Sequence, residues 1–373
     1  MNDTEDTIYQ LRIDSDQQGM ALALIQAGFG MLSTNPNPRV GAVIIKQQRV
    51  IGVGFTQPPG GNHAEIQALA DAAVRGEDVR GATVYVTLEP CSHFGRTPPC
   101  ADALIRAGVG RVVAAITDPN PLVAGQGLAK LQAAGIETAS GVLQAEAAEI
   151  NIGFLKRMRT GLPWVRMKTA ASLDGKTALN NGNSQWITSQ AARDDGHIWR
   201  ARACAVMAGI GTIAKDDAQL TVRAIDTPRQ PHRIVVDSKL TVSPQARVIE
   251  GGGTWVFTAS DDRDKRAALE DKGAEVIVLA NAEGKVDLPA LLRELGQRQV
   301  NELHVEAGSK LNASLIREAC VDELLVYLAP CLLGEGRNMF DLPPLQDLQG
   351  RIGLRFHELK QIGPDLRILA RFD

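Results

Sequence analysis

The sequence predicts an α/β protein built from two domains, residues 1–160 and 161–373. The first observation is length, because 373 residues exceed what one ordinary hydrophobic core holds together. The second is that segments with helical periodicity alternate with short runs of β-branched residues, as in largely parallel sheets covered by helices. The third is the stretch 151–163, where glycine and proline follow a helix and precede a new strand.

The first half supports this alternation element by element. Residues 16–30 space their apolar side chains as a helix does. Residues 39–55 are expected to form two strands joined by a polar turn at Lys46–Gln48. A helix is expected at 63–76, where Gly76 marks its end. The same patterns predict the remaining elements of this half, with strands at 82–90 and 111–119 and helices at 100–110 and 125–136.

The second half is expected to begin with strands within 164–179, then a polar loop at 180–189 and a helix at 190–203. Apolar runs predict the later strands, at 204–212, 233–238, 254–259, 274–280, 302–308 and 323–334. Gly209, Gly211 and Ala214 match the G-x-G-x-x-A pattern of a dinucleotide fold. The segment after them is a poor helix, and no suitably placed acidic residue follows the next strand, so a Rossmann fold is rejected.

Composition narrows the classes of function. The net charge is −3 and neither half is strongly basic, which argues against nucleic acid as a partner. No apolar run approaches the roughly 18 residues that span a bilayer, and the acidic N-terminus does not resemble a signal peptide. The sequence therefore predicts a cytoplasmic protein with no membrane partner and no disulfide framework. Cys204, Cys320 and Cys331 lie in apolar runs and are expected to be buried.

Two of the five cysteines lie in a different setting, a polar and proline-rich loop. His63 opens one predicted helix, Cys91 follows a strand, and Cys100 opens the next helix. One imidazole and two thiolates suit a catalytic zinc that leaves a fourth position to water, and a helix start favours the thiolate form of Cys100. Glu65, two residues beyond His63, is placed to shuttle protons. The order H-x-E and then P-C is the signature of zinc nucleobase deaminases.

Two alternatives to this catalytic zinc stay open at this point. His93 could supply a fourth ligand and close the site into a structural clip. His63, Cys91 and Cys100 could also be an unrelated helix cap and two loop cysteines. The usual signature has two residues between its cysteines, whereas eight separate Cys91 from Cys100.

The first half contains the segments TNPNPRVGAVI, HAEIQAL, VTLEPCSHFGRTPPC and TDPNPLVAGQGLAKLQAAGI. Together they closely resemble the deaminase part of the bacterial family of bifunctional riboflavin-biosynthesis deaminase-reductases, in which the longer cysteine loop is normal. The resemblance implies a cytidine-deaminase-like α/β/α domain in 1–160, with His63, Cys91 and Cys100 as zinc ligands and Glu65 as proton shuttle. It implies as substrate a diaminopyrimidinone that carries a ribosylamino 5-phosphate and whose 2-amino group is replaced by oxygen.

Five residues are candidates for reading such a substrate. Asn37, Asp118 and Asn120 can hydrogen-bond to a polar pyrimidine edge. Arg96 offers a positive donor for the phosphate or a ring carbonyl, and His93 is then interpreted as a substrate contact rather than a fourth zinc ligand. Turn chemistry stays the alternative for Asn37 and Asn120, because both lie beside prolines.

The second half contains MKTAASLDGKTA, SQWITS, HIWRARACAVMAGIGTIAKDDAQLTVR, VVDSKL and VEAGSKLNASLI. These resemble the reductase part of the same family. The resemblance implies a dihydrofolate-reductase-like α/β domain in 161–373 that uses NADPH to reduce the ribosyl group to a ribityl chain. By position it implies ribose phosphate contacts for Ser184, Arg200, Leu220, Arg223 and Glu306. It implies NADPH contacts for Ala170, Trp186, Thr212, Asp216, Ser238, Gly308, Ser309, Lys310, Leu311, Asn312, Ala313 and Ser314.

The chemistry of these residue types fits those roles. Two arginines can clamp a phosphate, and a glycine-rich turn that starts a helix presents free N–H groups to a pyrophosphate. Lys168 and Asp216 are candidates for proton transfer and orientation near the reacting carbon. The alternatives are surface helix charges for Arg200 and Arg202, and a turn cap for Asp216.

Two other functions compete with the bifunctional enzyme. One is a transfer-RNA or nucleoside deaminase fused to an unrelated domain, and the other is a binding protein whose zinc is structural. The extended cysteine loop and the lack of a basic face argue against the first. The family resemblance further implies a homo-oligomer, either a dimer or a tetramer.

Overall fold

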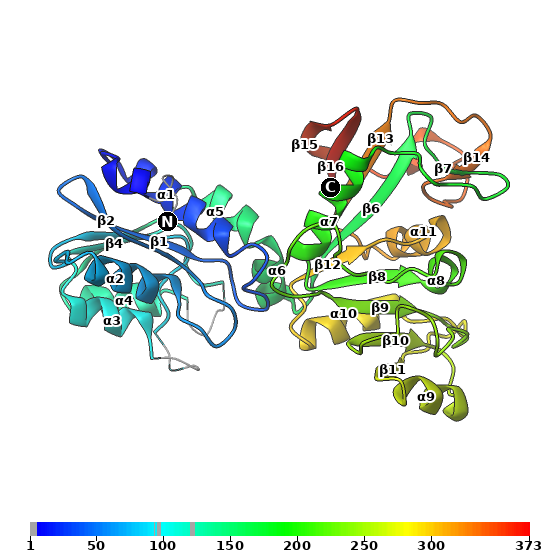
Figure 1. Cartoon of the computed structure of the whole chain (residues 1–373), viewed down its shortest axis with the longest axis horizontal. Helices are drawn as coiled ribbons and strands as arrows, with labels where there is room; N and C mark the ends of the chain where they lie inside the picture. Colours follow the sequence, from blue (N-terminus) through cyan, green and yellow to red (C-terminus); the bar gives the residue numbers. More distant parts are fainter. Residues whose placement is uncertain (1–5, 93, 95–97, 120–123) are drawn as a thin grey trace. The chain divides into compact units, whose positions relative to one another are not determined.

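The computed structural model describes residues 6–92, 94, 98–119 and 124–373. The chain forms two compact units, Met1–Thr160 and Gly161–Asp373 (Figure 1). Both units combine helices with a central sheet, as the α/β prediction requires. Among the described residues, no helix is long and apolar enough to cross a membrane.

The first unit is built on a five-stranded sheet in the order β2-β1-β3-β4-β5. Helices α1 and α5 cover one face of this sheet, and α2, α3 and α4 cover the other (Figure 1). The strands are β1 (Gly41–Lys46), β2 (Arg49–Phe55), β3 (Thr83–Val86), β4 (Arg111–Ala114) and β5 (Glu137–Ser140). The helices are η1 (Asp6–Gln10), α1 (Asp16–Phe29), α2 (Ala64–Val74), α3 (Cys100–Ala107), α4 (Gln126–Ala133), α5 (Gln144–Ile150) and α6 (Ile152–Thr160).

The sheet of this unit is mixed: four of its five strands run in one direction, in keeping with the prediction of a largely parallel sheet, and β1 runs antiparallel to both of its neighbours. The tight turn at Gln47 and Gln48, both with positive φ, makes β2 return antiparallel beside β1. The chain then passes through α2, and β3 pairs antiparallel with the other edge of β1. As a result, β2 and β3 run in the same direction on either side of β1. Only β3, β4 and β5, which are joined through helices, pair in parallel. The helix–strand alternation was predicted correctly, but it does not reveal which strand lies between two others.

The second unit contains a nine-stranded sheet in the order β11-β10-β9-β8-β12-β6-β13-β16-β15. The first seven strands of this order are parallel, and the β15–β16 hairpin joins antiparallel at one end. Its strands are β6 (Trp164–Ser172), β8 (Ala205–Gly209), β9 (His232–Val236), β10 (Thr254–Thr258), β11 (Ala274–Val278), β12 (Glu302–Val305), β13 (Glu323–Ala329), β15 (Leu354–Ile362) and β16 (Asp365–Phe372). Strands β7 (Lys176–Leu179) and β14 (Gly336–Asn338) form a separate pair.

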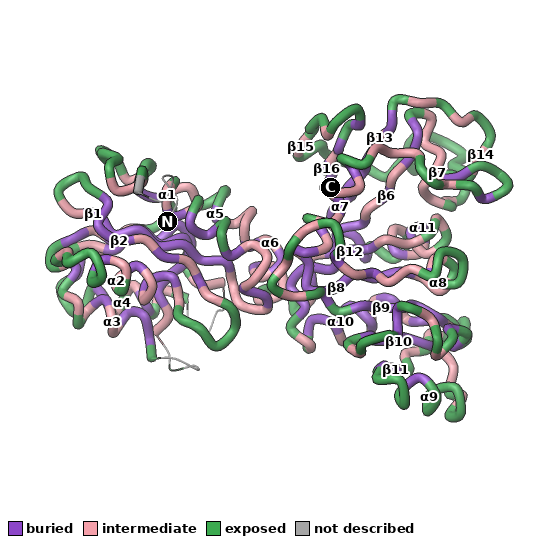
Figure 2. The backbone as a smooth tube through the Cα atoms, viewed as in Figure 1, coloured by how far each residue is buried: buried purple, intermediate pink, exposed green. Residues whose placement is uncertain are grey.

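Two layers of helices enclose the parallel strands of the second unit. Alternate residues of β8 face opposite clusters: Met207 packs with α10 and α11, whereas Val206 and Ala208 pack with α8 and α9. Figure 2 shows the strands as buried segments between more exposed helices. The helices are α7 (Gln190–Arg202), α8 (Ile210–Asp216), α9 (Arg263–Glu270), α10 (Leu288–Gln297), α11 (Ser309–Arg317) and η2 (Leu348–Gly350).

Several element boundaries differ from the sequence-based expectations. The strand expected at 204–212 ends at Gly209, because Ile210 already begins α8. The stretch 151–163, expected only as a boundary, is mostly the helix α6. Cys204 and Cys320 are buried as expected, but Cys331 is only half-buried, since it follows the end of β13.

A charged core lies among β6, β12 and β13. The Arg166 side chain is 1% exposed and donates to Glu302 at 2.9 Å and to Glu323 at 2.5 Å. Its guanidinium also lies over the Trp199 ring, 4.4 Å from the ring centroid. A buried charge is tolerated only when it is paired in this way. The network therefore fixes β6 and β12 side by side, and these strands carry Lys168 and lead to Glu306.

Candidate functional site

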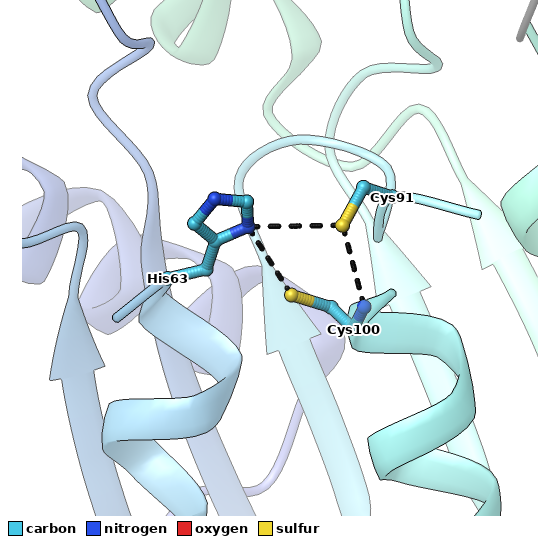
Figure 3. Close-up of side chains that lie close together, drawn as sticks. All are labelled: His63, Cys91 and Cys100. Carbon is cyan, nitrogen blue, oxygen red and sulfur yellow. Dashed lines mark hydrogen bonds between the residues drawn. The ribbon is translucent and has the colours of Figure 1, made fainter. Parts of the chain in front are cut away.

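Three elements of the first unit bring His63, Cys91 and Cys100 together (Figure 3). His63 is the N-cap residue of α2, Cys91 follows β3, and Cys100 is the first residue of α3. The Nδ1 atom of His63 lies 3.3 Å from Sγ of Cys100 and 3.7 Å from Sγ of Cys91. The backbone N–H of Cys100 donates to Sγ of Cys91 at 3.3 Å. All three ligand atoms lie within 4.8 Å of one another.

This spacing fits a tetrahedral metal ion. Zinc bonds of about 2.3 Å to sulfur and about 2.0 Å to nitrogen place the two ligand atoms about 3.5 Å apart at a tetrahedral angle. The two nitrogen–sulfur distances of 3.3 and 3.7 Å bracket that value. The donor set, one imidazole and two thiols, is also of the kind that zinc prefers. The residues present therefore fit a zinc ion with a fourth position available to water.

The electrostatics of the two thiols prepare the cluster for a cation. Hydrogen bonding from the Cys100 thiol, and then from His63, lowers the pKa of Cys91 below its usual value. The same contact raises the pKa of Cys100, because its proton is shared with the neighbouring sulfur. A divalent ion replaces such a proton with its own charge and holds both sulfurs as thiolates.

Glu65 lies in the first turn of α2, beside the cluster, and is only 4% exposed. Burial, followed by the charge on Cys91, raises the pKa of Glu65 to about 7. A carboxyl group with such a pKa can take up and return a proton near neutral pH, which is the requirement for a proton shuttle. The sequence prediction placed Glu65 near the metal, but it could not show that the side chain is buried.

The predicted substrate-reading residues are only partly described. Asn37 and Asp118 are half-buried, whereas His93, Arg96 and Asn120 lie outside the described residues. The backbone N–H of Asn37 donates to the Thr34 carbonyl at 2.9 Å, so Asn37 occupies a turn, as the alternative interpretation held. The carboxamide of Asn151 donates to and accepts from the Arg39 backbone, at 2.8 Å in both bonds, and so holds the end of this turn.

Sequence reasoning missed Glu89, a buried carboxylate that is 5% exposed. Its two oxygens accept hydrogen bonds from four backbone N–H groups in the segment that follows β4. The only available signal was its place in the LEPC segment, directly before Pro90 and Cys91. Nothing in the local sequence identifies backbone partners that lie 29 to 39 residues away.

In the second unit, Lys168, Arg200 and Glu306 lie close together. The Nε and Nη2 atoms of Arg200 of α7 donate to the two carboxylate oxygens of Glu306, at 2.5 and 2.8 Å. The third nitrogen, Nη1, donates to the Thr221 carbonyl at 3.0 Å. Burial lowers the pKa of Lys168 of β6, while Glu306 opposes the shift. Glu306 has a pKa well below its usual value, because Arg200 outweighs the opposing effect of burial. Arg200 is therefore no free surface charge, and the cluster combines a fixed anion with two cations.

Several of the remaining reductase candidates lie in the last residues of neighbouring parallel strands or beyond their carboxyl ends. Ala170 is in β6, Thr212 and Asp216 are in α8 after β8, and Ser238 follows β9. Asp216 is the last residue of α8. Ligands of such sheets bind at this edge. The residues Gly308, Ser309, Lys310, Leu311, Asn312, Ala313 and Ser314 form the N-cap and first turns of α11, which follows β12.

The other candidates occupy the loops around that edge. Trp186 is 68% exposed, and the Arg193 guanidinium lies 4.4 Å from the centroid of its ring. Leu220 is buried and has a φ of 56°, while the Arg223 backbone N–H donates to Nδ1 of His197 at 3.3 Å. Ser184 lies in the loop between β7 and α7. The sequence did not single out His197 or His304, because neither belongs to a recognisable motif.

The second unit is expected to lose stability when the pH falls below about 6.5. Burial lowers the pKa of His197 to about 4 and also lowers the pKa of His232 and His304 from 6.5. The unfolded chain then binds more protons than the folded chain below that pH, so the free energy of unfolding falls by up to about 1.4 kcal/mol per pH unit for the buried His304. The contributions of the more exposed His197 and His232 are smaller, because solvent screens them. All four tryptophans lie in this unit, so their fluorescence reports its urea unfolding in the full chain.

His304→Gln should flatten the pH dependence between pH 7.5 and pH 5.5, because the His304 side chain is fully buried. The matched control is His357→Gln, at an exposed position of β15, which should unfold with the wild-type pH dependence. An unchanged slope in His304→Gln would contradict the assignment of the effect to His304.

Comparison with known proteins agrees with this arrangement. Residues 13–116 match the cytidine and deoxycytidylate deaminase zinc-binding region, and residues 163–368 match the RibD C-terminal domain. Riboflavin biosynthesis protein RibD of Escherichia coli strain K12 is 46% identical over 365 residues, which cover 94% of this chain and 98% of that protein. The RibD of Aquifex aeolicus strain VF5 is 41% identical over 361 residues, with 96% and 98% covered.

Solved structures show the same relationship along the whole chain. Acinetobacter baumannii RibD, form 1, has a TM-score of 0.88 at 40% identity, covering 96% of this chain and 99% of that structure. A diaminohydroxyphosphoribosylaminopyrimidine deaminase/5-amino-6-(5-phosphoribosylamino)uracil reductase from Thermotoga maritima has a TM-score of 0.86 at 34% identity, with 96% and 99% covered. The cytidine-deaminase-like and RibD-reductase folds expected for the two halves are thereby confirmed. The chain, with a zinc-binding deaminase domain followed by a reductase domain, belongs to the RibD family of bifunctional riboflavin-biosynthesis enzymes.

Proposed function

We propose that the chain catalyses two successive steps of riboflavin biosynthesis, one in each unit. The first is hydrolytic deamination of 2,5-diamino-6-(5-phosphoribosylamino)pyrimidin-4(3H)-one, with release of ammonia. The second is reduction of the ribosyl group by NADPH to a ribityl chain, which gives 5-amino-6-(5-phosphoribitylamino)uracil. The observation that carries the proposal is the His63, Cys91 and Cys100 cluster, at zinc-ligand spacing and beside the buried Glu65.

In the deaminase unit, His63, Cys91 and Cys100 hold the zinc ion. Bound zinc lowers the pKa of water toward neutrality and so supplies a nucleophile at pH 7. Glu65 accepts a proton from the attacking water and returns it to the leaving amino nitrogen, so that ammonia departs and oxygen takes its place. Asn37 and Asp118, together with His93, Arg96 and Asn120, would hydrogen-bond to the pyrimidine.

In the reductase unit, NADPH, when bound, would supply the hydride for reduction of C1 of the ring-opened ribosyl group. Lys168 lies in the cluster with Glu306 and Arg200, so its ammonium can donate a proton or orient the sugar. The guanidinium groups of Arg200 and Arg223 would bind the phosphate, and Glu306 holds the guanidinium of Arg200 in place. The N-terminus of α11 presents backbone N–H groups to the pyrophosphate. Ala170, Trp186, Thr212, Asp216 and Ser238 complete the proposed cofactor contacts.

The test is to incubate the full chain with the diaminopyrimidinone nucleotide, with and without NADPH, and to follow the products by mass spectrometry. Without NADPH, the amino group should be replaced by oxygen and ammonia should accumulate. With NADPH, the same product should also gain two hydrogens. Unchanged substrate in both samples would refute the proposed function.

We also propose that the chain works as a homo-oligomer, a dimer or a tetramer. The supporting feature is β15, which forms one edge of the nine-stranded sheet and exposes Phe356 at 68% and Leu359 at 57%. Exposed apolar side chains on an edge strand are typical of surfaces that pair with another chain. Light scattering on the purified protein measures the assembly directly, and a monomeric mass at assay concentration would refute this proposal.

A further inference from the structure

Glu89 lies between β3 and the cysteine ligand Cys91 and connects two parts of the deaminase unit. One carboxylate oxygen accepts from the N–H groups of Asp118 and Gly125, both at 2.9 Å. The other accepts from Gly127 at 2.8 Å and from Leu128 at 3.2 Å. The first oxygen therefore holds both sides of the β4–α4 connection, and the second holds the first turn of α4.

The Glu89 carboxylate accepts the hydrogen bonds at the start of α4 that the N-cap residue of this helix cannot accept. Gly125, the N-cap, has a φ of 77° and no side chain, so the first N–H groups of the helix need an outside acceptor. An anion at a helix N-terminus is also favoured by the helix dipole. Because the acceptor is the side chain of residue 89, the start of α4 is fixed to the segment after β3 that contains Cys91.

Close packing reinforces this connection. A Cβ atom on Gly127 would meet the Pro90 carbonyl oxygen at 2.0 Å, so α4 approaches the backbone directly before Cys91 as closely as glycine allows. The Glu89 N–H also donates to the Ile116 carbonyl at 2.8 Å, which joins the ends of β3 and β4. Any shift of α4 or of Asp118 relative to Cys91 must break these contacts.

We propose that Glu89 is a positioning residue of the deaminase site. It holds Asp118, which is taken to bind the substrate, at a fixed position relative to the zinc ligand Cys91. The inference rests on the proposed function, since it takes Asp118 to contact the pyrimidine. Glu89 touches neither substrate nor metal in this role. It acts through the backbone that presents Asp118, so its loss should weaken substrate binding more than the chemical step.

Glu89→Gln tests this role in the full chain. The substituted amide turns one of the two oxygens into an N–H₂ donor that faces two backbone donors, so one pair of hydrogen bonds is lost. We expect deaminase kcat/KM to fall about tenfold to a hundredfold, mainly through a higher KM. Zinc content by atomic absorption and the reductase half-reaction of the same sample should stay at wild-type values. The matched control is Glu146→Gln, at an exposed position of α5, which should leave both activities unchanged.

Amide hydrogen exchange gives a readout that does not depend on activity. In Glu89→Gln, the amides of one pair, either Asp118 and Gly125 or Gly127 and Leu128, should exchange faster than in wild type. Glu89→Asp keeps the charge but is one methylene shorter, so it should recover part of the lost kcat/KM and serves if the glutamine variant folds poorly. A loss confined to kcat at unchanged KM is what a purely structural role would give, and it would overturn the proposal.

Two further outcomes would also overturn the proposal. One is wild-type deaminase kinetics in Glu89→Gln, and the other is loss of zinc, which would place the effect on Cys91 alone. Failure of the proposed function itself is distinguishable, because the wild-type chain would then show no deamination of the diaminopyrimidinone nucleotide.

Discussion

Replacing Glu65 by glutamine should abolish most deamination and leave the second activity intact. The variant keeps the size and hydrogen-bonding shape of the side chain but can no longer carry a proton between water and the leaving amine. Removing a general acid–base group of this kind costs about a hundredfold to ten-thousandfold in rate. Because Glu65 is buried and its pKa is raised to about 7, water from bulk solvent cannot easily take over its role in proton transfer. Ammonia release under saturating substrate measures the effect on kcat.

Two measurements on the same sample make this result specific. Zinc content should equal that of wild type, because the proposed metal ligands are His63, Cys91 and Cys100. NADPH consumption with the deaminated substrate should also be unchanged. Glu146→Gln, an exposed glutamate of the same unit, is the matched control. Wild-type deamination in Glu65→Gln with zinc bound would show that the proton shuttle is assigned to the wrong residue.

Replacing Lys168 by methionine should have the complementary effect. Methionine keeps the length and apolar stem of lysine but removes the ammonium that lies with Glu306 and Arg200. If that ammonium donates a proton or orients the ribosyl group, kcat for reduction should fall about a hundredfold or more. Deamination, measured by ammonia release, should continue at the wild-type rate, since Lys168 belongs to the other unit.

A fluorescence titration with NADPH separates chemistry from cofactor binding in this variant. We expect the cofactor to bind Lys168→Met with wild-type affinity, because Lys168 itself is not among the proposed NADPH contacts. Lys272→Met, at an exposed position after α9, is the matched control and should reduce normally. A Lys168→Met protein that reduces its substrate at the wild-type rate would remove Lys168 from the mechanism.

The metal cluster could be predicted because each of its residues has a position that the sequence itself defines. His63 and Cys100 lie at helix starts and Cys91 lies after a strand, and these features are visible in local periodicity and proline placement. The helix and strand pattern then brings such positions to the same edge of a sheet. The residue types also identify the ligand, since one imidazole and two thiols form a donor set that zinc prefers.

Other features depend on long-range pairing and left no local trace. Glu89 acts through backbone groups up to 39 residues away, and Arg166 is paired with Glu302 and Glu323, which lie 136 and 157 residues further on. The insertion of β1 between β2 and β3, which makes β1 antiparallel to both neighbours, was not visible in the sequence either. Sequence periodicity identifies elements, whereas these outcomes are decided by which elements pack together.

One chain carries a deaminase domain and a reductase domain, and only the deamination is expected to need the zinc ion that His63, Cys91 and Cys100 would hold. The most direct measurement is to assay both half-reactions of one protein sample before zinc removal by a chelator, after removal, and after zinc is added back. We predict that ammonia release disappears with the metal and returns with it, while NADPH-dependent reduction of the deaminated substrate stays constant throughout. Deamination that survives in zinc-free protein, or reduction that vanishes together with the metal, would contradict the account.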